Sequence, residues 1–195
     1  MDKGIFTDRE KAMEANYFRQ QDAKLLEKLR KGAKLDEIAV ALAEKLHVDN
    51  PDLLARIRAV GVTAENAEAF FAAPLVQVAW AEGRVSKREA EVVLRLARER
   101  GIEEASSSYA QLVEWLKVRP EDGLFDAAIE AIKHGFSVLP LMEREERIKQ
   151  LLDNCHKVAE ASGNEFAKQL GLGDGVSRVE ESVLDIIHRK LRGGA

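Results

Sequence analysis

The chain has 195 residues, of which 46% are hydrophobic and 33% charged, enough for one substantial core or for a core with an appended arm. Its formal net charge of -4 and its aromatic content of 6% argue against a broad nucleic-acid-binding surface. The single cysteine, Cys155, excludes an intramolecular disulfide and a cysteine-based zinc site. No apolar run approaches the roughly 20 residues that cross a bilayer, and the polar amino end is unlike a secretory signal, so we expect a cytoplasmic protein without a transmembrane segment.

The first predicted helix begins at a capping box, Thr7 followed by Glu10, and extends to Lys31, just before Gly32. Its apolar residues are sparse among charges, which is typical of an arm that binds a partner rather than of a core helix. We therefore predict an N-terminal amphipathic helical arm over residues 1–32. The same thin apolar stripe also suits a helix–helix dimer.

Connecting helices are predicted over residues 33–61. In the second of them, Asn50 and Pro51 read as a cap followed by a proline at the first helical position, and Gly61 ends the helix. The connecting helix before Asn50 carries apolar residues at near-helical spacing, namely Leu35, Ile38, Leu42 and Leu46.

A larger helical domain is predicted over residues 62–192, followed by a disordered tail at 193–195. Pro74 interrupts an apolar stretch and is expected to kink or split its helix. Ser86 and Glu89 form a capping box, and the helix that they begin ends at Gly101. Periodicity predicts further helices at Tyr109–Lys117, Phe125–Phe136, Arg144–Ala161 and from Ser177 onward. Since no alternating strand pattern of useful length occurs, the predicted fold class is an all-α multi-helix bundle.

This domain contains an internal repeat. Residues 78–83 read Val-Ala-Trp-Ala-Glu-Gly and are followed by Val85-Ser86 and Glu89; residues 158–163 read Val-Ala-Glu-Ala-Ser-Gly and are followed, after an insertion, by Val176-Ser177 and Glu180. Each copy predicts a helix, a glycine turn and a capped helix. We expect two similar helical hairpins that bury their Val/Ala faces against each other.

The repeat resembles the TerB-like (tellurite-resistance-associated) helical domains, whose signature is an Ala-Asp-Gly turn before a capped helix, repeated near the carboxyl end. The resemblance covers roughly residues 63–191 and implies a TerB-like bundle with a role in regulation or stress response. Family members are linked to metal binding through acidic turn residues, which implies that Glu82, Glu89 and Glu180 bind a divalent cation such as calcium. The first turn carries Glu82 in place of the usual Asp, and the second carries Ser162. Alternatively, Glu89 and Glu180 only close their capping boxes.

The arm resembles a second group of proteins. Residues 6–15 are similar to the start of the ATP-synthase inhibitor (zeta) proteins of alphaproteobacteria, and residues 14–31 to the inhibitory helix of the mitochondrial ATPase-inhibitor protein. The resemblance implies that the arm enters the catalytic interface of the F1 motor. Alternatively, its aromatic pair docks the arm on the protein's own body. The implied partner contacts are Glu10, Glu14, Tyr17, Phe18 and Arg19.

No catalytic constellation can be assembled from the sequence. The four histidines, at positions 47, 134, 156 and 188, show no metal-ligand spacing. Cys155 and His156 are adjacent, so on a helix their side chains diverge by about 100° and cannot form a nucleophile–base pair. The sequence therefore predicts a non-enzymatic protein-interaction module without a resident cofactor. The alternatives are an inhibitor of a rotary ATPase, acting through the arm, and a divalent-cation sensor.

Overall fold

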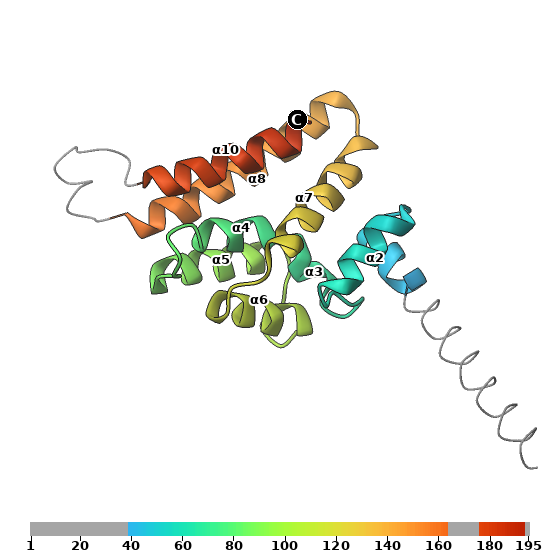
Figure 1. Ribbon diagram of the computed structural model, residues 1–195, viewed down its shortest axis with the longest axis horizontal. Helices are drawn as coiled ribbons and strands as arrows, with labels where there is room; N and C mark the ends of the chain where they lie inside the picture. Colours follow the sequence, from blue (N-terminus) through green and yellow to red (C-terminus); the bar gives the residue numbers. More distant parts are fainter. Residues whose placement is uncertain (1–38, 164–175, 194–195) are drawn as a thin grey trace, which may run out of the picture. The chain divides into compact units, whose positions relative to one another are not determined.

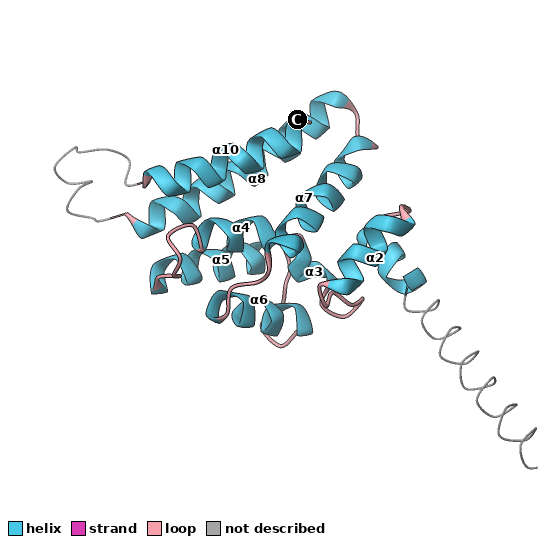
Figure 2. Cartoon of the chain, viewed as in Figure 1, coloured by secondary structure: helices cyan, strands magenta, loops and turns pink. Residues whose placement is uncertain are grey.

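The computed structural model describes residues 39–163 and 176–193. Over these residues the chain forms helices joined by loops and contains no strand, which confirms the predicted all-α fold class (Figure 2). The chain divides into a unit of Met1–Ala41 and a unit of Leu42–Ala195, and the helices below belong to the second. Within the described ranges, no helix combines the length and the apolar content that a membrane span requires.

Helix α2 (Pro51–Ala59) starts where the sequence predicts. The Asn50 side chain accepts hydrogen bonds from the backbone N–H groups of Asp52 and Leu53, at 3.0 and 3.1 Å. Pro51 occupies the first turn, where a missing N–H costs no helical hydrogen bond. The chain leaves the helix through Gly61, whose φ of +82° is a conformation that favours glycine.

Pro74 splits the apolar stretch as predicted. Helix α3 (Ala67–Phe70) ends before it, and helix α4 (Ala73–Ala79) carries the proline in its first turn. Helix α4 is apolar nearly all round and packs against α5, α7, α8 and α10, so it forms the centre of the core. Its buried residues are Ala73, Pro74, Leu75, Val76, Val78 and Ala79.

The remaining helices are α5 (Lys87–Glu99), α6 (Ser107–Lys117), α7 (Asp122–Ser137), α8 (Leu141–Ser162) and α10 (Arg178–Arg192). The starts of α5, α6 and α10 follow local sequence signals, because the hydroxyls of Ser86, Ser106 and Ser177 each accept a backbone N–H of the first turn. The indole N–H of Trp80 donates to the carbonyl of Trp115 at 2.7 Å, which ties the turn after α4 to the end of α6.

The two predicted hairpins correspond to α4–α5 and to α8–α10. Helices α8 and α10 lie side by side and antiparallel, with α4 and α5 packed against α8 (Figure 1). Val78 and Ala79 of the first copy, and Val158 and Ala159 of the second, are all fully buried. Small residues at these positions allow close approach of the helices, so the repeated Val/Ala faces form part of one core.

Candidate functional site

Two capping boxes of identical spacing begin α5 and α10. The Ser86 hydroxyl accepts from the N–H of Glu89 at 3.2 Å, and the Glu89 carboxylate accepts from the N–H of Ser86 at 2.7 Å. Between Ser177 and Glu180 the same two distances are 3.3 and 2.7 Å. Each box satisfies donors that a helix start leaves without an intrahelical partner. The caps therefore give both repeated glutamates a structural role.

Both of these carboxylates are removed from solvent. Glu89 is 3% exposed and Glu180 is 0% exposed. Glu180 also accepts from the Ser162 hydroxyl at 2.6 Å, which links the end of α8 to the start of α10. Burial raises the pKa of Glu89 above its ordinary value of 4.5; hydrogen bonds from Ser86 oppose the rise, and the charges of Glu180 and Glu82 add to it. The second copy thus holds its glutamate with an additional hydroxyl donor.

The three glutamates predicted to bind a cation are placed differently from one another. Glu82 is exposed, whereas Glu89 and Glu180 are buried and engaged in their caps. Within residues 39–163 and 176–193, no group of three or more His, Cys, Asp or Glu side chains is arranged to hold a metal ion. Calcium takes six or more oxygen ligands, so a site at these residues needs further donors. The cation site stays a prediction.

An open cavity of about 560 Å³ lies beside the turn between α7 and α8. Five segments contribute to it: the residues before α2, the α3–α4 junction, the end of α5, the end of α7 with its following turn, and the first half of α8. Its size is in the range of small-molecule sites. Its apolar lining comprises Leu46, Phe71, Ala131, Ile132, Phe136, Val138, Leu139 and Leu151.

Arg100, the residue after α5, brings a positive charge to this apolar cavity. The residue is exposed, yet desolvation by the surrounding protein lowers the pKa of its guanidinium below the ordinary 12.5. The only other group of the described chain that acts on this pKa is the Cys155 thiol. A second arginine of the lining, Arg147, is paired with Glu143 at 3.6 Å. Arg100 has no such carboxylate partner among the described residues.

Three large apolar side chains at the turn between α7 and α8 are exposed to solvent. Val138 is 79%, Leu141 66% and Met142 83% exposed. We call these three residues the corner ridge; it adjoins the cavity, which Val138 also lines. The sequence interpretation missed both features, although the run Val138-Leu139-Pro140-Leu141-Met142, apolar throughout at a helix boundary, was a signal for the ridge.

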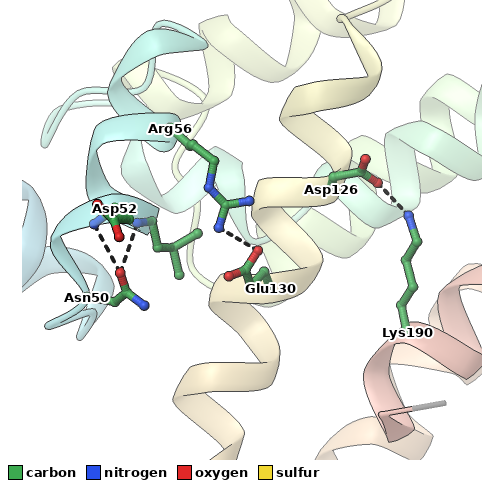
Figure 3. Close-up of polar contacts among 7 residues, drawn as sticks. Asn50, Asp52, Arg56, Asp126, Glu130 and Lys190 are labelled. Carbon is green, nitrogen blue, oxygen red and sulfur yellow. Dashed lines mark hydrogen bonds and ion pairs between the residues drawn. The ribbon is translucent and has the colours of Figure 1, made fainter. Parts of the chain in front are cut away.

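Helix α7 is also bracketed by ion pairs on another face (Figure 3). Arg56 of α2 pairs with Glu130 at 2.6 Å, and Lys190 of α10 pairs with Asp126 at 2.5 Å. All four side chains are about half exposed, so each pair contributes only about 0.2–1 kcal/mol to stability. These two pairs tie α2 and α10 to α7, and they engage four of the charged side chains that line the open groove there.

The predicted absence of a cysteine nucleophile agrees with the environment of Cys155. The thiol is fully buried, and burial raises its pKa from 9.0 to about 12. Its neighbour His156 is exposed and lines a shallow polar hollow between α8 and α10 instead. Cys155 is therefore a small apolar core residue at neutral pH.

The predicted contacts of the arm, Glu10, Glu14, Tyr17, Phe18 and Arg19, lie outside the described residues. Their role stays a prediction. No family model matches the chain, and neither the curated proteins nor the solved structures provide a match. The resemblances to TerB-like domains and to ATPase inhibitors therefore stand on the residues quoted for them.

Proposed function

We propose that the protein is a non-enzymatic interaction module that binds a protein partner at the corner ridge. The resemblance to TerB-like domains adds regulation or stress response as its setting. The observation that carries the proposal is the exposure of Val138, Leu141 and Met142 together, at 79%, 66% and 83%. Single exposed apolar residues are ordinary, but a contiguous group beside a cavity is typical of an interaction site.

The chemistry of the ridge supports this proposal. Methionine is flexible and polarisable, so Met142 suits a surface that must adapt to a partner. Leu141 and Met142 lie in the first turn of α8, and Arg144, two residues after Met142, donates to the carbonyls of Phe136 and Ser137, at 3.1 and 2.7 Å. These hydrogen bonds hold the turn between α7 and α8 in one conformation. A rigid turn that presents apolar side chains loses little entropy on binding.

The environments of the chemically reactive side chains also favour binding over catalysis. Cys155 is a buried, protonated thiol at neutral pH, because its pKa is raised to about 12. The ring of His134 pairs with the exposed Asp49 at 2.8 Å, and the hydroxyl of Ser137 donates to the backbone carbonyl of His134 rather than to its ring. These side chains supply no activated nucleophile.

The test is cross-linking followed by affinity capture from a lysate of the source cells, with the full chain and a ridge variant, V138S/L141S/M142S. The matched control is V118S/V179S, which changes two exposed valines elsewhere, at 62% and 52% exposure. We expect a defined protein to be retained by the wild type and the control and lost from the ridge variant, with unchanged melting temperatures. Identical captured sets for all three chains would overturn the proposal.

A further inference from the structure

The cavity beside the corner ridge combines an apolar wall with Arg100, whose charge has no carboxylate partner among the described residues. The wall is built from side chains of α7, α8, the α3–α4 junction and the residues before α2, chiefly Leu46, Phe71, Ile132, Phe136 and Leu151. At about 560 Å³, it is large enough for an organic ligand rather than for a few waters. An apolar site of this size favours a ligand with a substantial hydrocarbon part.

The charged residues that line the cavity indicate which polar group the ligand carries at the end of its hydrocarbon part. Arg147 is neutralised by Glu143, at 3.6 Å, whereas no carboxylate of the described residues pairs with Arg100. An arginine keeps its charge at neutral pH, and a guanidinium beside apolar surface gains from an anionic partner that the protein itself does not provide. Its planar fork of N–H donors matches the two oxygens of a carboxylate.

We propose that this cavity binds a medium-chain alkyl monocarboxylate, a fatty-acid-like amphiphile. The carboxylate pairs with the guanidinium of Arg100, and the alkyl chain lies along the apolar wall toward Val138 at the cavity rim. This inference goes beyond the partner binding at the corner ridge and does not depend on it. One unpaired positive charge selects a monoanion over a neutral or cationic amphiphile of the same length.

The direct test is calorimetric titration of the full chain with decanoate below its critical micelle concentration. Decanol and decylamine serve as matched ligands without the negative charge. We expect saturable binding of decanoate at one site, and at least about tenfold weaker binding of the other two, because a charge-assisted pair with the guanidinium is lost. Octanoate is expected to bind more weakly than decanoate by roughly fourfold per missing methylene.

Two substitutions test separately how the cavity binds the carboxylate of the ligand and its alkyl chain. Arg100→Gln removes the anchor, and it is expected to weaken decanoate at least about tenfold while leaving decanol unchanged. Gly135→Leu fills the cavity: Gly135 lines it within α7, and a Cβ added there meets nothing within 4 Å. Leucine is also the better helix former, so the variant is expected to fold and to weaken decanoate and decanol alike. Gly135→Ala is the control that adds one methyl.

Four results would contradict the proposed ligand site. Absence of decanoate binding, equal affinity for decanol and decanoate, or decanoate affinity unchanged in Arg100→Gln would each overturn the proposal. Unchanged affinity in a folded Gly135→Leu would place the ligand elsewhere and overturn it too. If Gly135→Leu does not fold, the Arg100→Gln result decides. Of the three ridge residues only Val138 also lines the cavity, so the variant L141S/M142S tests partner capture without altering the ligand site.

Discussion

Replacing each of the two buried glutamates by glutamine and by alanine separates the structural role of these residues from cation binding. In Glu89→Gln, the amide oxygen can still accept from the N–H of Ser86, the hydrogen bond that the carboxylate now accepts at 2.7 Å. The substitution removes only the charge, whose burial raises the pKa of Glu89. We therefore expect the unfolding free energy at pH 7 to be unchanged or increased.

The sign of the pH effect follows from the same shift. Between the ordinary value of 4.5 and the raised value, the folded protein holds a proton on Glu89 that the unfolded chain has lost. The unfolding free energy of the wild type therefore falls as pH rises through this window, and it levels off above the raised pKa. Subtracting the curve of Glu89→Gln isolates this contribution. A difference curve that is flat from pH 4 to 7 would refute the reasoning.

The alanine variants give the size of the capping contribution. Glu89→Ala removes the carboxylate that accepts from the N–H of Ser86 in a part-buried, charge-assisted hydrogen bond, a loss of about 1–3 kcal/mol. Glu180→Ala removes the acceptor of Ser177 and the fully buried side chain itself, and we expect about 2–4 kcal/mol. The Ser162 hydroxyl loses less, because the carbonyl of Ala159 lies 2.8 Å away as an alternative acceptor. Urea unfolding followed by circular dichroism measures all four variants.

Calcium titration of the same variants tests the predicted cation site. If Glu82, Glu89 and Glu180 are ligands, millimolar calcium raises the melting temperature of the wild type and not of the glutamine variants. If the glutamates act as caps alone, calcium has no effect on any of them. A calcium-dependent increase in the wild type that both Glu89→Gln and Glu180→Gln abolish would show that the caps are not their whole role.

Three further predictions concern stability and the arm. Ser86→Ala and Ser177→Ala each remove one side of a capping box and are expected to cost about 1 kcal/mol in urea unfolding; a loss below a few tenths for both would contradict the cap geometry. Phe70→Ala empties a fully buried position and is expected to cost about 3–5 kcal/mol, whereas Arg56→Ala breaks an exposed pair and costs at most about 1; a reversed order would contradict the assigned core. A peptide of residues 6–31 is expected to slow ATP hydrolysis by purified F1 if the resemblance to ATPase inhibitors holds, and unchanged hydrolysis at high peptide concentration would remove that function.

The sequence predicted the helices well where their boundaries depend on local chemistry. Asn50 and Pro51 start α2, and Ser86 with Glu89 starts α5, because a cap satisfies backbone donors within a few residues of itself. Cys155 is buried together with Ile148, Leu151 and Val158 on one face of α8, and this spacing is likewise a periodic signal within one element. These features need no knowledge of the tertiary structure.

The cavity could not be predicted in the same way, because it exists only where five segments meet. Arg100 follows directly after α5, where a cationic side chain is ordinary in any helix. Nothing in its sequence neighbours shows that it lines one cavity with Phe71 and Phe136, far away along the chain, or that no carboxylate of the described residues pairs with it. The absence of a partner for a charge is a property of packing, and periodicity carries no information about it.

The internal repeat explains where the cavity and the ridge arise. Helix α4 begins at Ala73, five residues before Val78, whereas α8 begins at Leu141, seventeen residues before the equivalent Val158. The part of α8 without a counterpart in α4 therefore covers residues 141–152, and every residue of α8 that lines the cavity or forms the ridge falls within it. The matched halves of the hairpins pack into the common core. The unmatched half of α8 adds Ile148 and Leu151 to this core, and its solvent-facing residues Leu141 and Met142 form the part of the ridge that has no equivalent in the first copy.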